Sequence, residues 1–99
     1  MSYTLIIKSL AQIDIEEAAC WYEQKSVGLG SVFLEEIEDK LLIIQKNPNL
    51  FEIKYKQVDQ AFLYRFPFLI HYIIDMEIIF VLAILHTNRN PQIMAQRNK

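Results

Sequence analysis

Two apolar stretches near the C-terminal end dominate the hydrophobic pattern of the chain. Residues 66–74 and 78–85 are rich in β-branched and aromatic side chains, and the tripeptide at 75–77 separates them. Each stretch is too short to span a bilayer, and a short polar break between two such stretches is typical of a buried β-hairpin. The pattern therefore predicts two paired strands there.

Two earlier segments alternate between apolar and polar positions with the period of a strand. Residues 3–8 predict a first strand, and residues 51–56 predict a half-buried strand that carries Lys54 and Lys56 on one face. Residues 61–66 predict a further strand, with a bend or bulge at the following proline. Residues 58–60 fit either a turn or a weak continuation of a strand.

Apolar residues recur at helical spacing in two segments between these strands. The first helix is expected from about Leu10 to Lys25, and Ser9 with Gln12 matches a capping box at its start. The second helix is expected to end before Pro48. A tight corner between them is expected at Gly28 and Gly30. Acidic residues of the second helix are expected on its solvent-exposed side: Glu35, Glu36, Glu38 and Asp39.

The element order is therefore β-α-α-β-β-β-β. It predicts a single α+β domain over residues 1–99, with a helical hairpin packed on a mainly antiparallel, twisted sheet. The hydrophobic fraction of 53% with two glycines and three prolines supports dense packing. One cysteine excludes an internal disulfide, and the absence of a signal-peptide pattern makes the cytoplasm the expected location, with no membrane partner.

The net charge of −2 divides unevenly along the chain. Residues 1–49 carry four lysines against eight acids, whereas residues 50–99 carry six cations against four acids. Nucleic-acid-binding proteins usually have a stronger basic excess, so any contact with RNA or DNA is expected to be local. The two histidines and one cysteine form no set with metal-like spacing, so neither a metal nor another cofactor is expected.

Some side chains in the second half could perform or support ribonuclease chemistry. RNA cleavage requires a base, an acid and cations that stabilise the charge on the phosphate. The candidates are Lys54, Lys56, Tyr64, Arg65, His86 and Arg89. The two lysines fit equally well as the solvated face of an edge strand. His86 is a candidate contact residue or a strand cap that binds backbone, and His71 is expected in the core.

The last strand is apolar on both faces, since positions 78, 80, 82 and 84 alternate with 79, 81, 83 and 85. One helical hairpin covers only one face of a sheet. A partner chain could cover the other face by strand addition or with an amphipathic helix. The C-terminal segment or a homodimer are the alternatives.

Five segments, in this order along the chain, resemble the ParE/RelE superfamily of toxins. They are residues 18–22, 28–34, 47–51, 65–72, and 81–86 with Arg89-Asn90-Pro91. The resemblance implies the toxin of a bacterial type II toxin–antitoxin (plasmid stabilisation) pair, with a cognate antitoxin as partner. ParE-type members poison DNA gyrase, and RelE-type members cleave messenger RNA on the ribosome.

The resemblance assigns partner or target contacts to Arg65, Arg89, Arg97 and His86, with Lys54 and Lys56 behind them. This chain departs from the superfamily at positions that are often basic or aromatic in relatives, namely Asp59, Gln60, Asn88, Asn90 and Met94. Because the basic set is sparse, we expect a ParE-like toxin that binds its target. A RelE-like nuclease that uses Lys54, Lys56, Arg65, His86 and Arg89 is one alternative. A non-toxic relative that only binds its antitoxin is another.

Overall fold

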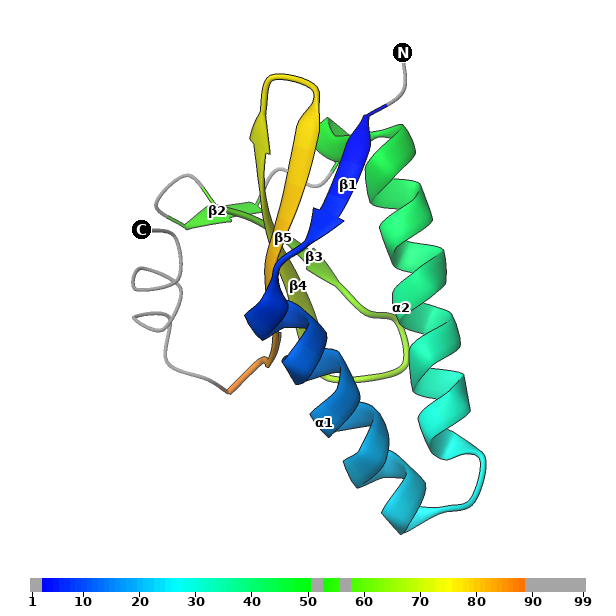
Figure 1. Ribbon diagram of the computed structural model, residues 1–99. Coiled ribbons are helices and arrows are strands. Elements are labelled where there is room, and N and C mark those ends of the chain that lie inside the picture. Colours follow the sequence, from blue (N-terminus) through cyan, green and yellow to red (C-terminus); the bar gives the residue numbers. More distant parts are fainter. Residues whose placement is uncertain (1–2, 51–52, 56–57, 89–99) are drawn as a thin grey trace.

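Two α-helices, joined by a tight corner, pack across one face of a five-stranded sheet (Figure 1). The computed structural model describes residues 3–50, 53–55 and 58–88, and for residues 50 and 53–55 it describes the backbone alone. The described elements, in chain order, are β1 (Thr4–Ile7), α1 (Ser9–Lys25), α2 (Leu29–Lys46), a 3-10 turn (Pro48–Leu50), β2 (Ile53–Tyr55), β3 (Val58–Phe62), β4 (Phe68–Asp75) and β5 (Ile78–His86). This order confirms the predicted β-α-α-β-β-β-β arrangement.

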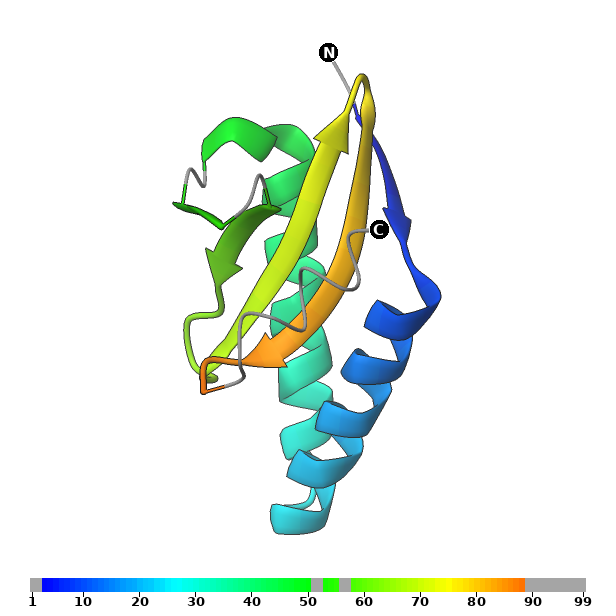
Figure 2. The ribbon, with the colours of Figure 1, turned by 90° about the vertical axis from the view of Figure 1, so that its left-hand side faces the viewer.

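The sheet brings the N-terminal strand beside the last strand. Its spatial order is β1-β5-β4-β3-β2, in which β1 pairs with β5 in parallel and the other neighbours pair antiparallel. Figure 2 shows the long, curved β4–β5 hairpin in front and both helices behind it. The α+β class with a mainly antiparallel sheet is therefore confirmed.

Two glycines shape the corner between the helices for different reasons. Gly28 has a φ of +91°, a left-handed conformation that side chains disfavour. Gly30 lies inside α2, where an added Cβ would be 2.6 Å from the Ala19 carbonyl oxygen, so it permits close approach of the helices. The Glu23 carboxylate accepts hydrogen bonds from the amides of Gly28 (2.9 Å) and Gly30 (3.0 Å) and so satisfies the start of α2. The corner prediction is confirmed.

The predicted capping box at Ser9 is wrong. The residue before α1 is Lys8, which makes no side-chain cap hydrogen bond, and Ser9 is already helical. The Lys8 amide donates to the Val81 carbonyl at 2.9 Å, and the Lys8 carbonyl accepts from the Gln12 amide at 3.0 Å. Hydrogen bonding to β5 thus continues up to Lys8, and α1 begins at the next residue. No turn that could carry a capping side chain separates β1 from α1.

The predicted strand at 61–66 is also wrong, because β3 occupies Val58–Phe62 and residues 63–67 form a loop. We refer to residues 63–67 as the β3–β4 loop. Its apolar side chains, Leu63 and Phe66, are buried in the core. The apolar run therefore anchors a loop to the core, and the ambiguous residues 58–60 belong to the strand.

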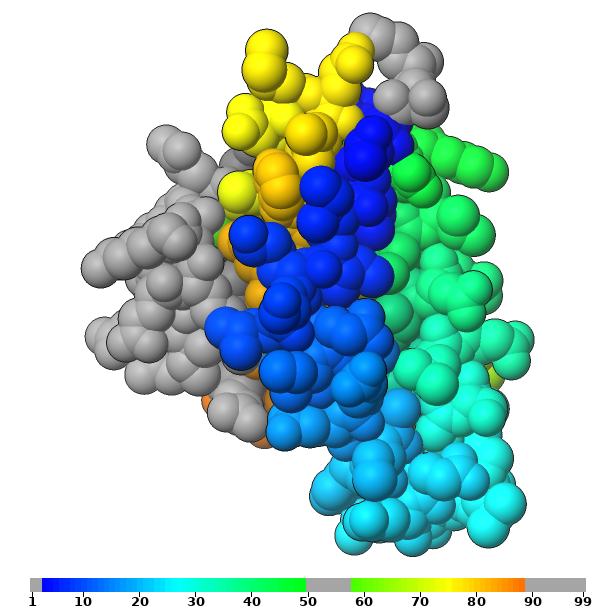
Figure 3. Space-filling model, viewed as in Figure 1, coloured from blue at the N-terminus to red at the C-terminus, as the bar shows by residue number. Residues whose placement is uncertain are grey.

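The main core lies between the helices and the sheet. It contains buried side chains of both helices and the helix-facing side chains of β3, β4 and β5, including Phe33, Ile44, Ile70, Tyr72 and Ile79. Figure 3 shows α1 and α2 side by side at the surface, with their joined ends extending beyond the sheet. Within the described ranges, no helix combines the length and apolar character required to cross a membrane.

A smaller cluster is buried on the opposite face of the sheet. Val58, Leu82, Ala83 and Leu85 form it, with Ile73 and Phe80 packed against it. The four cluster residues are thus shielded from solvent, Ile73 and Phe80 only in part, and which of the predicted covers lies over this face stays a prediction. The C-terminal segment, which was one predicted cover for this face, lies outside the described residues.

Candidate interaction site

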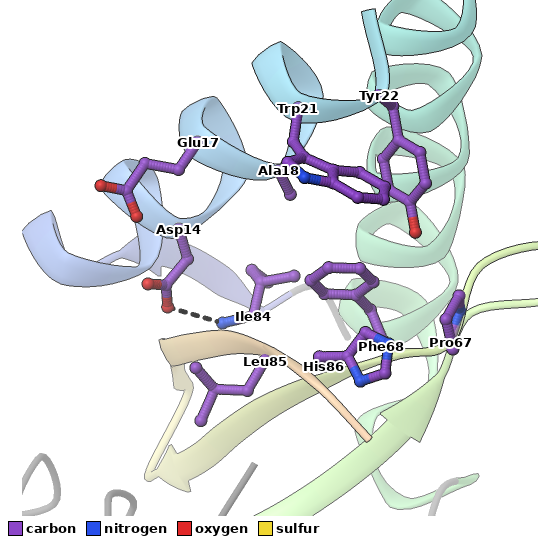
Figure 4. A pocket seen from close by; sticks show the side chains of 10 residues that line it. All are labelled: Asp14, Glu17, Ala18, Trp21, Tyr22, Pro67, Phe68, Ile84, Leu85 and His86. Atoms are coloured by element: carbon purple, nitrogen blue, oxygen red, sulfur yellow. Dashed lines mark hydrogen bonds between the residues drawn. The ribbon is translucent and has the colours of Figure 1, made fainter. Parts of the chain in front are cut away.

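A groove of about 500 Å³ lies between α1 and the end of the β4–β5 hairpin (Figure 4). Side chains of α1 form one wall, and side chains from the start of β4 and the end of β5 form the other. The lining residues are Asp14, Glu17, Ala18, Trp21 and Tyr22 on α1, and Pro67, Phe68, Ile84, Leu85 and His86 on the opposite wall. The α1 residues share one helical face because their spacing follows the helical period.

One end of the groove is aromatic and the other end is acidic (Figure 4). The Tyr22 and Phe68 ring centroids are 6.1 Å apart, and Phe33 and Phe66 pack against Tyr22 beneath them. Trp21 is 54% exposed, and the Lys25 ammonium lies 4.8 Å from its ring centroid. Figure 4 shows Asp14 and Glu17 on α1 beyond these rings. The groove therefore presents an apolar surface with a negative edge.

A β-bulge places His86 in this groove. His71 pairs with Ala83, but Tyr72 pairs with Val81, so Leu82 is an extra residue in β5. The extra residue reverses the alternation of side chains, so Ile84 faces the helices while Leu85 faces the opposite cluster. Because His86 is two residues after Ile84, its side chain is on the same face of the strand and lines the groove. The even alternation along 78–85 that the sequence predicted is therefore wrong beyond Leu82.

Asp14 accepts a hydrogen bond from a backbone amide of β5 at a position where β5 is no longer paired with β1. The β1 pairing ends at Val81, and beyond it the Asp14 carboxylate accepts a hydrogen bond from the Ile84 amide at 3.0 Å. This bond is drawn in Figure 4. A paired amide makes the short exposed edge less available for unspecific strand pairing.

His86 binds backbone at the end of β5, as expected for a strand cap, and its role as a contact residue stays a prediction. Its Nδ1 accepts a hydrogen bond from the Asn88 amide at 3.1 Å, and its ring lies 5.4 Å from the Phe68 ring. The half-buried imidazole therefore stabilises the end of the strand and also lines the groove.

A buried carboxylate on α2 holds the β3–β4 loop. Glu36 is 9% exposed and accepts hydrogen bonds from the amides of Tyr64 and Arg65 (2.9 Å for Arg65) and from Arg65 Nε (3.1 Å). Burial alone would raise the pKa of Glu36, but the hydrogen bonds from Arg65 and Tyr64 outweigh it and lower this pKa. The prediction that Glu36 lies on the solvent-exposed side is wrong.

The loop that Glu36 holds presents polar and aromatic side chains to solvent. Tyr64 is 91% exposed, the preceding Phe62 is 51% exposed, and the Arg65 side chain is 57% exposed. Sequence reasoning selected Arg65 but missed Glu36 as its partner, because an acid beside other acids on a helix has no sequence signal of burial.

Two of the residues predicted for the site lie at the same end of the sheet. Arg65 lies shortly before β4, and His86 is the last residue of β5. A hydrogen bond from the Thr87 amide to the Pro67 carbonyl (2.9 Å) joins the two segments that carry them. For Lys54 the backbone alone is described, in β2, and Lys56, Arg89 and Arg97 lie outside the described residues. The contacts assigned to Lys54, Lys56, Arg89 and Arg97 thus stay predictions.

Two further residues that the sequence analysis discussed, His71 and Asp59, are buried. The burial of His71 confirms its expected place in the core. In the part of the chain that the structure describes, no three His, Cys, Asp or Glu side chains are grouped in a way that could hold a metal ion.

Comparison with known proteins gives one family match and several similar folds. The profile of the family described as the ParE toxin of the type II toxin–antitoxin system parDE matches residues 5–91. A chain of a chromosomal ParDE system from P. aeruginosa is 18% identical with a TM-score of 0.71, over 86% of this chain and 96% of that chain. A chain of the RelBE2 toxin–antitoxin complex from Mycobacterium tuberculosis is 13% identical with a TM-score of 0.60, over 87% and 99%. A search of curated proteins gave no significant match.

Proposed function

The chain belongs to the ParE toxin family of type II toxin–antitoxin systems, and from this membership we propose that it arrests growth by binding DNA gyrase and that a cognate antitoxin neutralises it. The family match over residues 5–91 is the observation that carries the proposal. This range includes both walls of the groove and the Glu36–Arg65 pair.

The distribution of cations supports target binding over RNA cleavage. Of the six cations in residues 50–99, Arg65 is the one whose side chain the structure describes, and its Nε is hydrogen-bonded to Glu36. At positions where relatives often carry arginine, β3 has the buried Asp59 and the half-buried Gln60. Cleavage of RNA at neutral pH requires several cations around the phosphate. A toxin that inhibits its target by binding it does not need such a cluster of cations.

The groove supports the antitoxin part of the proposal. Its aromatic end suits the apolar side chains of an amphipathic segment, and Asp14 and Glu17 at the other end suit basic side chains. We assign the antitoxin to this groove, where its segment would cover Trp21 and lie along the end of β5.

Expression of the chain alone and together with the neighbouring antitoxin gene tests this function. We expect growth arrest with the chain alone, normal growth with both proteins, and inhibition of gyrase supercoiling by the purified chain. Codon-specific cuts in transcripts would instead support a RelE-like nuclease. Normal growth at confirmed expression of the folded chain would contradict toxicity and leave a relative that only binds its antitoxin.

A further inference from the structure

We propose that the β3–β4 loop is the surface that contacts the protein target, with Tyr64 and Arg65 making the contact and Glu36 positioning both. The inference rests on the proposed function, because it assigns the target-binding surface of the same toxin. It commits to a protein partner that offers a carboxylate to Arg65 and an apolar contact to Tyr64.

The exposure of the loop residues is the first observation. Tyr64 is 91% exposed, although the loop that carries it is anchored in the core by Leu63 and Phe66. Tyrosine and arginine are the side chains most enriched among residues that dominate binding energy at protein interfaces. The Tyr64 side chain is too exposed to contribute much to the core, and the terminal part of the Arg65 side chain also faces solvent, so both remain available to a partner.

The Glu36 carboxylate is the second observation. It binds two consecutive loop amides and the Arg65 Nε, so it fixes the loop backbone and one edge of the guanidinium at once. A loop that is already ordered loses less conformational entropy on binding, which increases affinity. Glu36 thus acts on the target through the loop, as a positioning residue.

The free part of the guanidinium defines the chemistry of the partner. Within the described residues, the terminal nitrogens of Arg65 make no hydrogen bond, and the side chain is 57% exposed. Two parallel N–H groups of arginine match the two oxygens of a carboxylate. An acidic side chain on the target is therefore the expected partner of Arg65.

The surrounding charges favour a protein over a nucleic acid. Glu35, Glu38 and Asp39 lie within one turn of Glu36 on α2, and residues 1–49 carry eight acids against four lysines. A row of phosphates would be repelled by this helix, whereas a single carboxylate can pair with Arg65 alone.

The test compares loop variants with matched controls in two assays. Arg65→Ala, Arg65→Lys, Tyr64→Ala and Glu36→Gln are compared with wild type and with three controls. The controls are Lys46→Ala for lost charge, Val27→Ala for lost exposed apolar area, and Glu35→Gln for the same chemical change on the same helix. The assays are growth arrest in cells and the affinity of each purified chain for DNA gyrase. Antitoxin affinity measures selectivity, and the circular dichroism spectrum of each variant reports that it is folded.

We expect Arg65→Ala and Tyr64→Ala each to weaken gyrase affinity roughly 10- to 30-fold, as for other central interface residues. Arg65→Lys is expected to weaken it as well, because lysine lacks the two-pronged donor. Glu36→Gln is expected to give a smaller loss, about 3- to 10-fold, since it loosens the loop without removing a contact. Antitoxin affinity of the loop variants, and both affinities of the three controls, are expected to match wild type within about twofold, because none of the substituted residues lines the groove.

Several results would overturn the inference. If wild type arrests growth and all four loop variants do so equally, the loop is not the target surface, although the proposed function stands. A parallel loss of antitoxin affinity would show that the loop has no selective role. If the variants lose affinity for an oligouridine RNA but keep gyrase affinity, the partner is a nucleic acid. If wild type neither arrests growth nor binds gyrase, the proposed function fails first.

Discussion

At the scale of single residues, three carboxylates on the helices bind backbone amides of other segments. Glu36 binds the β3–β4 loop, Glu23 binds the start of α2, and Asp14 binds the edge of β5. An ionised carboxylate forms stronger hydrogen bonds than a neutral acceptor, and an amide without its acceptor is costly when shielded from water. These side chains therefore fix the relative positions of elements that are distant in sequence.

Glu36 is expected to make stability depend on pH. Its pKa is lower in the folded chain than its ordinary value, because the hydrogen bonds from Arg65 and Tyr64 outweigh the effect of burial. The stabilisation is therefore complete above the ordinary pKa of about 4.5 and is lost as pH falls through the lowered value. We expect Glu36→Gln to cost about 2 kcal/mol of unfolding free energy at neutral pH and to differ less from wild type in acid.

Urea denaturation of both chains at pH 7 and near pH 3 measures this difference. Glu35→Gln is the control, since Glu35 is an exposed neighbour on the same helix, and its cost is expected to be small at both values. An equal penalty for Glu36→Gln at both pH values would show that the charge of Glu36 does not contribute.

At the scale of elements, the two glycines of the helical corner should respond differently to alanine. A Cβ at Gly30 would lie 2.6 Å from a backbone oxygen of α1, so the helices would have to separate, at a cost of about 3 kcal/mol. At Gly28 nothing lies within 4 Å of the added atom, and the left-handed backbone alone costs about 1 kcal/mol. Thermal unfolding of both variants measures the two costs. A larger cost at Gly28 would contradict the proposed close approach of the helices.

The identity and order of the elements, the helical corner and the β4–β5 turn could be predicted, whereas the connection between β3 and β4 could not. Hydrophobic periodicity predicts a helix or a strand because one face of each must be buried, and this held for both helices and for the β4–β5 hairpin. The strand assigned to 61–66 failed because Leu63 and Phe66 are buried from a loop, and burial alone does not distinguish a loop anchor from a strand.

The site was less predictable, since its geometry depends on contacts between distant residues. The bulge at Leu82 that brings His86 to the groove has no signal in a uniformly apolar strand. The burial of Glu36 depends on amides 28 and 29 residues further along the chain. Arg65 and His86 were selected from a family resemblance, and the structure places both at one end of the sheet.

At the scale of the whole molecule, the groove and the β3–β4 loop are separate surfaces on one rigid frame. Glu36 of α2 holds the loop, and α1 forms one wall of the groove. The two surfaces meet at Pro67, the last residue of the loop, and Phe68, the first residue of β4, because both line the groove. An antitoxin bound in the groove would therefore sit next to the loop assigned to the target. Neutralisation by such an antitoxin requires only that it obstruct the target, with no change in the fold.

Trp21 makes occupation of the groove directly measurable, because it is the only tryptophan of the chain and is 54% exposed in the groove wall. Binding of a tryptophan-free antitoxin should shift its fluorescence to shorter wavelength and reduce quenching by acrylamide. Glu17→Lys should weaken binding about 3- to 10-fold at low salt and less at high salt, since it reverses a charge at the groove edge. Glu16→Lys makes the same change beside the groove, outside its lining, and should have little effect. Tight binding measured by calorimetry without any change in Trp21 emission would place the antitoxin on a different surface.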